Sequence, residues 1–522
     1  MIQLQKKGQL FFSLILISLI SFFSTQATAQ DKLSFDKVYS VYLRNSGTIT
    51  AQGQIKGYFF LYQSDKVDKH TNEYTLQILD ENLNKVSSIK FEDSKTLSLL
   101  ESAYDGTSIS FLFKNIESNT LDMKIYTLEG KLKYTYSRPF DKQTDDLMKQ
   151  YATMHTDEGT NKNVFDIRGN GYVSVLPLRE GSQRSYEVDF FSSQSKKQWI
   201  YTPMDEEKYA FAEYLGSTDS LVIIEVMKKN KALSGQITSH LVGLNFMTRK
   251  KVFELEESKE QYKIMPASVS SLPNGNVLVM GAYYDKKENM LKDYGLGIAI
   301  YELSGSGKVI NRSFNSWEGD FSRFLHTGSN GKIDDIGYLY VHRMIRTPDN
   351  NLFVVCEGYK KQASAGGIAL SVLMQSPSGI TKVVVTDLVI MQFDPQYKIT
   401  GATIYPKTHN TAVGGAVSDY NSQHALAAAI KALGGFDYEF TTGEADNSNF
   451  TICYKNSERT ADYKGKTFNS IRYTGTKFST DKIELKTNAS DSRVFPAKPG
   501  SVMILEYFKK EKKLGLRLEK LG

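Results

Sequence analysis

Short runs of alternating apolar and polar residues recur along the whole chain, and turn residues separate them. The stretch 264–314 contains four such runs. They are divided by a Pro-Asn-Gly turn at 273–275, a polar insert at Asp285–Asp293 and a Gly-Ser-Gly-Lys turn at 305–308. Alternation with a period of two is typical of strands with one buried face, and tight turns join antiparallel neighbours. The pattern therefore predicts a four-stranded antiparallel meander.

The same set of four runs repeats along the chain. The expected second strands begin near Tyr58, Ser108, Tyr172, Leu221, Asn276, Leu352, Asn449 and Val502. Most of the steps between them are close to the roughly 40–50 residues of a propeller blade. A single meander cannot cover its two apolar faces, whereas meanders packed radially bury each other's faces and leave only short edges.

The ends of the chain suggest how such a ring would close. The last set supplies only three strands, and the run Lys32–Leu43 is an isolated strand near the N-terminus. We therefore expect an all-β fold, a β-propeller of seven or eight four-stranded antiparallel blades, closed by pairing of the N- and C-terminal strands. The alternative is two stacked β-domains or a sandwich array, divided at the polar link around Gln143–Asn163.

Two insertions account for the longest steps, one near residues 366–380 and one near 409–435. The second contains the only convincing helical pattern, at Ser422–Leu433, and Gly434 and Gly435 follow it as a C-terminal stop signal. We expect one short helix between blades 6 and 7.

Residues 1–29 have the organisation of a secretory signal peptide. Lys6 and Lys7 precede the apolar run 10–23, and Ala27-Thr28-Ala29 forms a small-residue cleavage site. The apolar run is shorter than the roughly 20 residues of a spanning helix. We expect cleavage, a mature chain 30–522 folded as one propeller domain without a membrane-spanning helix, and a periplasmic, extracellular or outer-membrane-associated location.

The charge balance and the motif content argue against several classes of function. The net charge is +6 over 522 residues, and no basic cluster typical of nucleic-acid binding stands out. The sequence lacks H-E-x-x-H, G-x-S-x-G, P-loop and C-x-x-C motifs. We expect a monomer with no cofactor, no metal and no nucleic-acid partner. Cys356 and Cys453 lie in apolar strands, which allows either a disulfide in an oxidising compartment or two buried free thiols.

The most unusual polar group lies in the run Tyr338–Arg346 and its expected partner strand. Strict alternation would place His342, Met344 and Arg346 on one face, and Glu357 ends the partner strand. The innermost strand of a propeller blade lines the central channel. His342, Arg346 and Glu357 are therefore candidates for a binding site at the channel mouth, unless they only pair with one another in the channel wall.

Trp317 is a further candidate, because its loop, Asn-Ser-Trp-Glu-Gly-Asp, separates two of the predicted blades. It is expected to be either an exposed platform for sugar or peptide contacts or an apolar plug between blades.

The residues around His342–Lys361 and the C-terminal run VMILEYFKKEKKLGLRLEKL resemble uncharacterised secreted proteins of Bacteroidota-type bacteria, a family of unknown function with propeller-like repeats. The resemblance covers most of the mature chain and implies no catalytic residues. Our leading hypothesis is a non-enzymatic binding module for a protein, peptide or glycan. The alternatives are a propeller enzyme acting on an envelope or extracellular polymer, and a structural component of a cell-envelope assembly.

Overall fold

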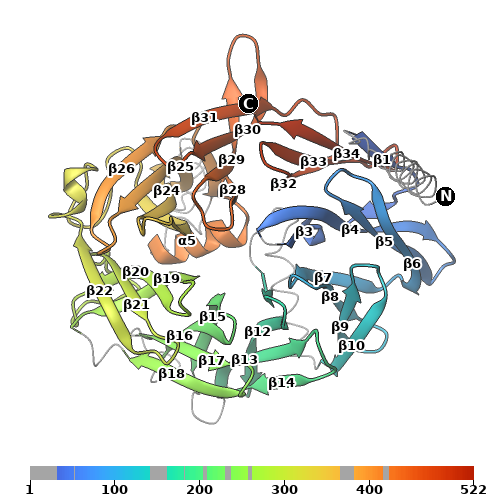
Figure 1. Cartoon of the computed structure of the whole chain (residues 1–522), viewed down its shortest axis with the longest axis horizontal. Coiled ribbons are helices and arrows are strands. Elements are labelled where there is room, and N and C mark those ends of the chain that lie inside the picture. The colour runs from blue at the N-terminus through green and yellow to red at the C-terminus, as the bar shows by residue number, and fades with distance from the viewer. Residues whose placement is uncertain are drawn as a thin grey trace, which may run out of the picture.

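Eight antiparallel sheets are arranged around a central axis in the computed structural model (Figure 1). The structure describes residues 32–51, 53–140, 162–181, 183–203, 209–229, 237–256, 261–364, 381–414 and 423–521. The signal-peptide prediction, the insertion near 366–380 and most of the link around 143–163 lie outside these residues. Each sheet is one blade of four strands, with a fifth strand in two of the blades, and in seven blades the four strands follow in sequence order from the axis outwards.

The first four blades follow the repeat expected from the sequence. Blade 1 consists of β2 (Ser40–Val41), β3 (Gly47–Ala51), β4 (Gln54–Lys66), β5 (Thr71–Asp80) and β6 (Lys85–Ser94), with β2 and β3 both paired to β4. Blade 2 consists of β7 (Leu97–Tyr104), β8 (Ser108–Asn115), β9 (Thr120–Thr127) and β10 (Leu132–Pro139). Blade 3 consists of β11 (Val164–Ile167), β12 (Gly171–Glu180), β13 (Gln183–Ser192) and β14 (Gln198–Tyr201). Blade 4 consists of β15 (Ala210–Ser217), β16 (Leu221–Lys228), β17 (Thr238–Asn245) and β18 (Lys250–Glu256).

The next three blades continue the ring. Blade 5 consists of β19 (Lys263–Ser271), β20 (Val277–Tyr284), β21 (Gly297–Leu303) and β22 (Val309–Ser316). Blade 6 consists of β23 (Tyr338–Arg346), β24 (Leu352–Ala363), β25 (Thr381–Phe393) and β26 (Ile399–Tyr405), with β27 (Asn410–Gly414) also paired to β25. Blade 7 consists of β28 (Tyr438–Gly443), β29 (Phe450–Arg459), β30 (Lys464–Tyr473) and β31 (Phe478–Glu484).

Blade 8 closes the ring with strands from both ends of the chain. It consists of β32 (Asp491–Pro496), β33 (Ser501–Phe508), β34 (Lys513–Lys520) and β1 (Lys32–Phe35). Residues of β1 pair with β34 from Lys32↔Arg517 to Phe35↔Leu514. The predicted closure is confirmed and the number of blades is eight. The alternative of two stacked β-domains is wrong, because one ring includes strands on both sides of the link.

A one-residue bulge recurs in the innermost strand of five blades. In blade 6, Val341 pairs with Cys356 and Arg343 pairs with Val355, which leaves His342 as the extra residue. The equivalent extra residues are Leu100, Leu215, Ala267 and Glu439 in blades 2, 4, 5 and 7. A bulge reverses the alternation of side chains beyond it. The strict alternation expected for Tyr338–Arg346 is therefore interrupted at His342.

The core lies between the blades rather than inside a single sheet. One apolar cluster joins blades 5 and 6 and includes Met344 and Cys356. The next cluster joins blades 6 and 7 and includes Ile345. Cys453 belongs to a third cluster, between blades 7 and 8. Both cysteines are free and buried on different blade interfaces, so the disulfide that the sequence allowed is not formed.

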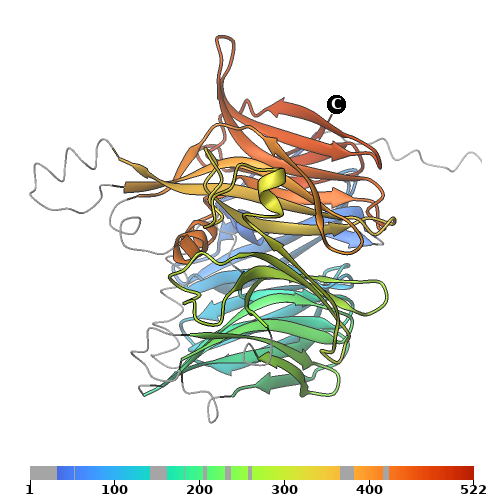
Figure 2. The same ribbon diagram turned by 90° about the vertical axis from the view of Figure 1, so that its left-hand side faces the viewer.

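The helix predicted near residues 422–433 is α5 (Gln423–Ala432). Figure 2 shows it on one face of the ring, close to the axis and next to the end of β24 and β25. Leu426, Ala427 and Ile430 pack against Val383, Val385 and Phe436. Among the described residues, no helix combines the length and apolar character needed to cross a membrane.

Candidate functional site

His342 and Glu357 lie together, as the sequence suggested. The bulge in β23 directs the His342 ring toward blade 7, and its Nε2 atom is 3.1 Å from Oε2 of Glu357. The Glu357 side chain is fully buried, and 8% of the His342 side chain is exposed. The pair is therefore inside the wall of the ring.

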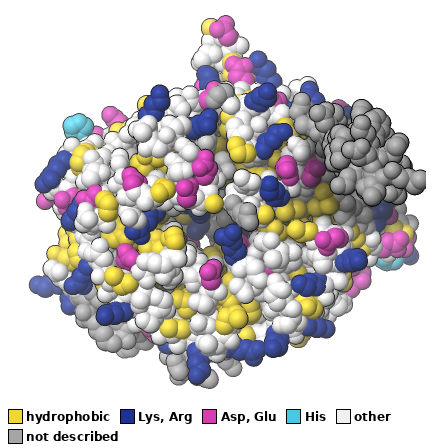
Figure 3. All heavy atoms as spheres, in the orientation of Figure 1, with side chains coloured by type: hydrophobic (Ala, Val, Ile, Leu, Met, Phe, Trp, Pro, Cys, Tyr) yellow, Lys and Arg dark blue, Asp and Glu magenta, His cyan; other side chains and the backbone are white. Residues whose placement is uncertain are grey.

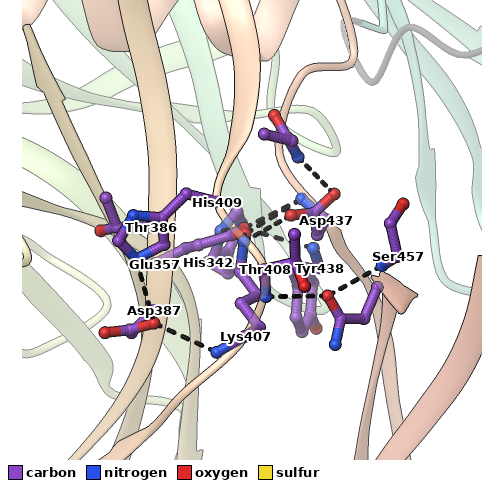
Figure 4. A network of polar contacts seen from close by, with 12 residues as sticks. His342, Glu357, Thr386, Asp387, Lys407, Thr408, His409, Asp437, Tyr438 and Ser457 are labelled. Atoms are coloured by element: carbon purple, nitrogen blue, oxygen red, sulfur yellow. Dashed lines mark hydrogen bonds and ion pairs between the residues drawn. The ribbon is translucent and has the colours of Figure 1, made fainter. Parts of the chain in front are cut away.

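Glu357 accepts hydrogen bonds from several further groups (Figure 4). Lys407 Nζ lies 2.9 Å from its Oε1 atom. The backbone N–H of Asp437 donates to both carboxylate oxygens at 3.1 Å, and that of Tyr438 donates to Oε2 at 3.2 Å. A buried carboxylate needs such donors, because burial without them strongly disfavours the charge.

Two carboxylates share one lysine in this network. Lys407 also pairs with Asp437. Burial opposes ionisation of Glu357, but the hydrogen bond from His342 and the charge of Lys407 outweigh it and lower the pKa of Glu357. Burial raises the pKa of Asp437 to about 6 against the charge of Lys407, and the Glu357 carboxylate adds to the rise. The two acids are thus driven apart in pKa, with Glu357 held ionised.

The network joins the two ends of the insertion that carries α5. Lys407 precedes the insertion and Asp437 follows it. The Asn410 side chain donates to Asp437 at 2.6 Å, and the Thr408 N–H donates to Asn456 of blade 7 at 3.0 Å. Asp387 accepts a hydrogen bond from the Lys407 N–H at 3.1 Å and lies 3.4 Å from the His409 ring. The polar groups therefore fix where the insertion leaves and re-enters the ring.

Aromatic rings surround the imidazole. His342 stacks on Tyr438 with centroids 4.5 Å apart and meets Phe436 edge-on at 5.0 Å. Phe436 stacks on Tyr340 at 4.5 Å. Near the same end of blade 6, Tyr338 stacks in parallel on Tyr294 of blade 5, with centroids 5.4 Å apart. Tyr294 remains 44% exposed, so one aromatic ring at this end of blade 6 is open to solvent.

Arg346 does not join His342 and Glu357. Its guanidinium is 3.5 Å from the Tyr397 hydroxyl, which donates to Glu302 of blade 5 at 2.7 Å. Met344, two residues earlier, packs on the same blade 5 side. The bulge at His342 explains the separation, because it turns His342 away from the face that Met344 and Arg346 share.

Trp317 is a plug between blades and not an exposed platform. Only 8% of it is exposed, and it packs in the cluster between blades 5 and 6, with Phe321 at 4.7 Å. Gly331 lies against the indole so closely that a Cβ atom there would come within 2.6 Å of the ring.

Sequence reasoning missed Lys407 and Asp437, which lie in no motif. It also missed Lys431 of α5, whose Nζ atom is 2.8 Å from Glu213 of β15. The repeat itself carried one usable signal. Glu225 in blade 4 is equivalent to Glu357 in blade 6, because each glutamate pairs with the residue that lies two positions before the bulge in the innermost strand.

Blade 7 repeats the pairing of blade 6 with the charges exchanged. Its bulge residue, Glu439, forms an ion pair of 2.7 Å with Lys455, the residue equivalent to Glu357. A polar pair between the bulge residue and this position of the neighbouring strand thus occurs in two successive blades, whereas the bulge residues of blades 2, 4 and 5 are apolar. This equivalence favours the interpretation in which His342 and Glu357 pair in the wall.

Residues 10–522 match the model of a family of unknown function, DUF6770. The chain belongs to this family. No curated protein matches the sequence. The resemblance to a family of unknown function with propeller repeats is therefore confirmed, and membership of DUF6770 adds no assigned residue to the site.

Solved structures similar to this DUF6770 chain include two peptidases and a lyase. One, from a study of two prolyl endopeptidases, has a TM-score of 0.40 and 10% identity over 91% of this chain and 54% of that chain. Dipeptidyl peptidase 4 of Porphyromonas gingivalis has a TM-score of 0.37 and 10% identity over 90% and 56%. A PL25 ulvan lyase has a TM-score of 0.37 and 7% identity over 81% and 91%. This chain spans about half the length of the two peptidases.

Proposed function

We propose that the protein is an exported, non-enzymatic propeller module that binds a protein, peptide or glycan at the end of the ring that carries α5. One observation carries the proposal. The groups best suited to acid–base chemistry, His342 and Glu357, are buried and bonded to the protein, whereas the aromatic ring of Tyr294, which stacks on Tyr338 at the start of the same strand as His342, is 44% exposed. A general base must reach the proton that it removes, and Glu357 is enclosed by its four donors.

The position of α5 supports recognition at the surface of this end rather than inside the channel. The helix contacts the innermost strand of blade 4 through Lys431 and Glu213. Its His424 ring is 2.7 Å from the hydroxyl of Tyr284 in blade 5, and the Tyr359 hydroxyl of blade 6 donates to the Gln423 carbonyl at 3.1 Å. Three blades thus hold the helix at the mouth, next to the stacked pair Tyr294–Tyr338.

A binding screen tests the proposal. The chain 30–522 is titrated with oligosaccharides, peptidoglycan fragments and short peptides, and binding is measured by calorimetry. The variant Tyr294→Ala is expected to weaken affinity for the ligand about five- to tenfold, because exposed aromatic contacts contribute roughly 1 kcal/mol. The matched control Leu132→Ala removes a similarly exposed apolar side chain from another blade.

Turnover of the same compounds is measured in parallel. Binding without turnover supports the proposal. Turnover that is lost in Glu357→Gln while the unfolding midpoint is unchanged would overturn it in favour of the propeller enzyme.

A further inference from the structure

A lysine recurs at one position of the repeat. In five blades the turn between the third and outermost strands is closed by an N–H that donates to a lysine carbonyl. These are the bonds Thr127→Lys131, Ser192→Lys197, Ser304→Lys308, Asp394→Lys398 and Thr474→Lys477, with lengths from 2.9 Å at Lys131 to 3.2 Å at Lys477. Lys250 ends the equivalent turn of blade 4, where it pairs with Asn245. In blade 1 this turn is closed by the Asn84 carbonyl, which accepts from the Asp80 N–H at 2.9 Å, and Lys85 follows it at the start of β6. In blade 8 no turn joins the last two strands, and Lys32 begins β1.

These eight lysines, one from each blade, are named the lysine ring. Equivalent turns of a propeller lie on the same face, because every blade repeats the same strand directions. The lysine ring therefore lies around the outer part of one face. The turns between second and third strands, and α5, lie on the opposite face (Figure 2). Figure 3 views the face that carries the lysine ring, where Lys and Arg side chains recur around the periphery.

All eight side chains are exposed, and in the described part of the chain none forms an ion pair with a carboxylate. Lys398 Nζ donates to the Phe314 carbonyl at 2.6 Å, and Lys85 lies over the Phe35 ring at 4.9 Å. The turns add Lys196 and Arg249, while the turns of blades 3, 4, 5 and 7 contain no acidic residue. The corresponding turns of blades 1, 2 and 6 contain Glu81, Glu129 and Asp394, and Asp349 and Glu444 lie in inner turns nearer the axis.

Exposed aliphatic side chains accompany the lysines. They are Val86, Leu132, Ile200, Val252 and Ile310, with exposed fractions of 57%, 54%, 46%, 40% and 53%. Val86, Val252 and Ile310 are the extra residues of bulges at the start of the outermost strands. A bulge re-aims a side chain at a sheet edge, so the repeat presents an aliphatic residue beside the lysine in several blades.

We propose that the lysine ring docks this face of the propeller on an anionic lipid membrane surface. Lysines spread around a closed ring meet a planar partner together, whereas a linear polyanion would contact only part of the ring. Lysine next to exposed aliphatic residues is the composition that binds the boundary between headgroups and acyl chains. The chain also enters β1 at Lys32 on this face, so the N-terminal segment joins the ring there.

Vesicle co-sedimentation tests this proposal independently of ligand binding at the α5 end. The chain 30–522 is mixed with phosphatidylcholine vesicles, with or without 30% phosphatidylglycerol. We expect binding only to the anionic vesicles and loss of binding at about 0.5 M salt, where charges are screened within a few ångströms.

The decisive variant is Lys131→Glu, Lys197→Glu, Lys308→Glu. Each lysine near an anionic surface contributes about fivefold in affinity, so the triple variant should bind at least about 100-fold more weakly. The matched control is Lys66→Glu, Lys69→Glu, Lys510→Glu, which makes the same charge change in exposed turns of the opposite face. A triple variant to Gln keeps the test valid if the Glu variant fails to fold.

Three results would overturn the proposal: no binding to anionic vesicles, equal losses in the two triple variants, or binding that ignores salt. Binding to a soluble anionic polysaccharide without binding to vesicles would also overturn it and assign the lysine ring to a polyanion.

Discussion

Glu357 is a single side chain on which three parts of the chain converge. His342 of β23, Lys407 before the insertion and the N–H groups that begin blade 7 all bond to its carboxylate. Removing one partner of a buried charge network costs more than the network contributes, because the remaining charge stays buried without its counterion. The residue is therefore expected to matter for stability.

Glu357→Gln should lower the free energy of unfolding by about 3 kcal/mol, because Lys407 would keep only Asp437 as a counterion. Urea denaturation measures the change. The control is Glu439→Gln, which breaks the equivalent but partly exposed pair with Lys455 and should cost about 1 kcal/mol or less. Equal effects in the two variants would contradict the structural role assigned to Glu357.

Glu225 is the blade 4 equivalent of Glu357, but the hydrogen bond that it accepts comes from a hydroxyl group and not from a lysine. Its partner is the Ser239 hydroxyl at 2.7 Å, and burial raises its pKa to about 8. Between the ordinary glutamate pKa and 8, the folded state keeps a proton that the unfolded state has released. Stability contributed by this group is therefore present at low pH and falls as the pH rises through that window.

Glu225→Gln should flatten the decline in stability between pH 5 and 8, since the variant has no proton to release. The slope that it removes is at most about 1.4 kcal/mol per pH unit. Chemical denaturation at several pH values measures the slope. Glu129→Gln, at an exposed turn, should leave the profile unchanged, and a Glu225→Gln profile that matches the wild type would refute the assignment.

At the scale of elements, the bulges and α5 decide the character of the site. The bulge in β23 turns His342 toward blade 7, and the same bulge carries leucine in blades 2 and 4, alanine in blade 5 and Glu439 in blade 7. The helix is held by an apolar face on blade 6 and by polar contacts to blades 4 and 5. A short helix of this length depends on such tertiary contacts, because isolated helices below about 12–15 residues are marginal in water.

Lys431→Met should loosen α5 without affecting the ring. The lost ion pair with Glu213 is partly exposed, so we expect about 1 kcal/mol or less in local opening and up to about fivefold faster amide exchange in Gln423–Ala432. The global unfolding midpoint should not move. Lys482→Met, which breaks the exposed pair with Glu458 of blade 7, serves as the control and should leave exchange in α5 unaltered.

At the scale of the whole molecule, the ring is held closed by a four-residue strand. Phe35 of β1 is 7% exposed and meets Phe60 of blade 1 edge-on at 5.4 Å. It packs in the cluster that includes Leu505 and Leu514 of blade 8. The strand thus supplies both the last hydrogen-bond ladder and part of the interface between blades 8 and 1.

Phe35→Ala should destabilise the protein by about 3–5 kcal/mol and should expose the amides of β34 to exchange. Phe253→Ala is the matched control, because Phe253 is 8% exposed in the outermost strand of blade 4, away from the closure. Its cost should be similar, but β34 should keep its protection. Hydrogen exchange distinguishes the two, and protection of β34 in both variants would contradict closure through β1.

The sequence by itself determined the repeat, the closure and the position of the helix. Alternation with turn residues is a local property, and the spare run Lys32–Leu43 could be assigned to closure because the last set lacked a strand. In the structure this run divides into β1 (Lys32–Phe35) of blade 8 and β2 (Ser40–Val41) of blade 1, so only its first part closes the ring. Pairing of His342 with Glu357 also followed, since both lie in adjacent strands.

Only the tertiary structure decided which contacts the candidate site residues make. The bulge that separates His342 from Arg346 depends on the register between strands, which alternation does not reveal. Lys407 and Asp437 meet Glu357 only because the insertion starts and ends at one place, and Trp317 is a plug only because blades 5 and 6 close around it. The lysines of the lysine ring are visible in most repeats of the sequence, but they form one surface only when the blades close into a ring, since closure places equivalent turns on the same face.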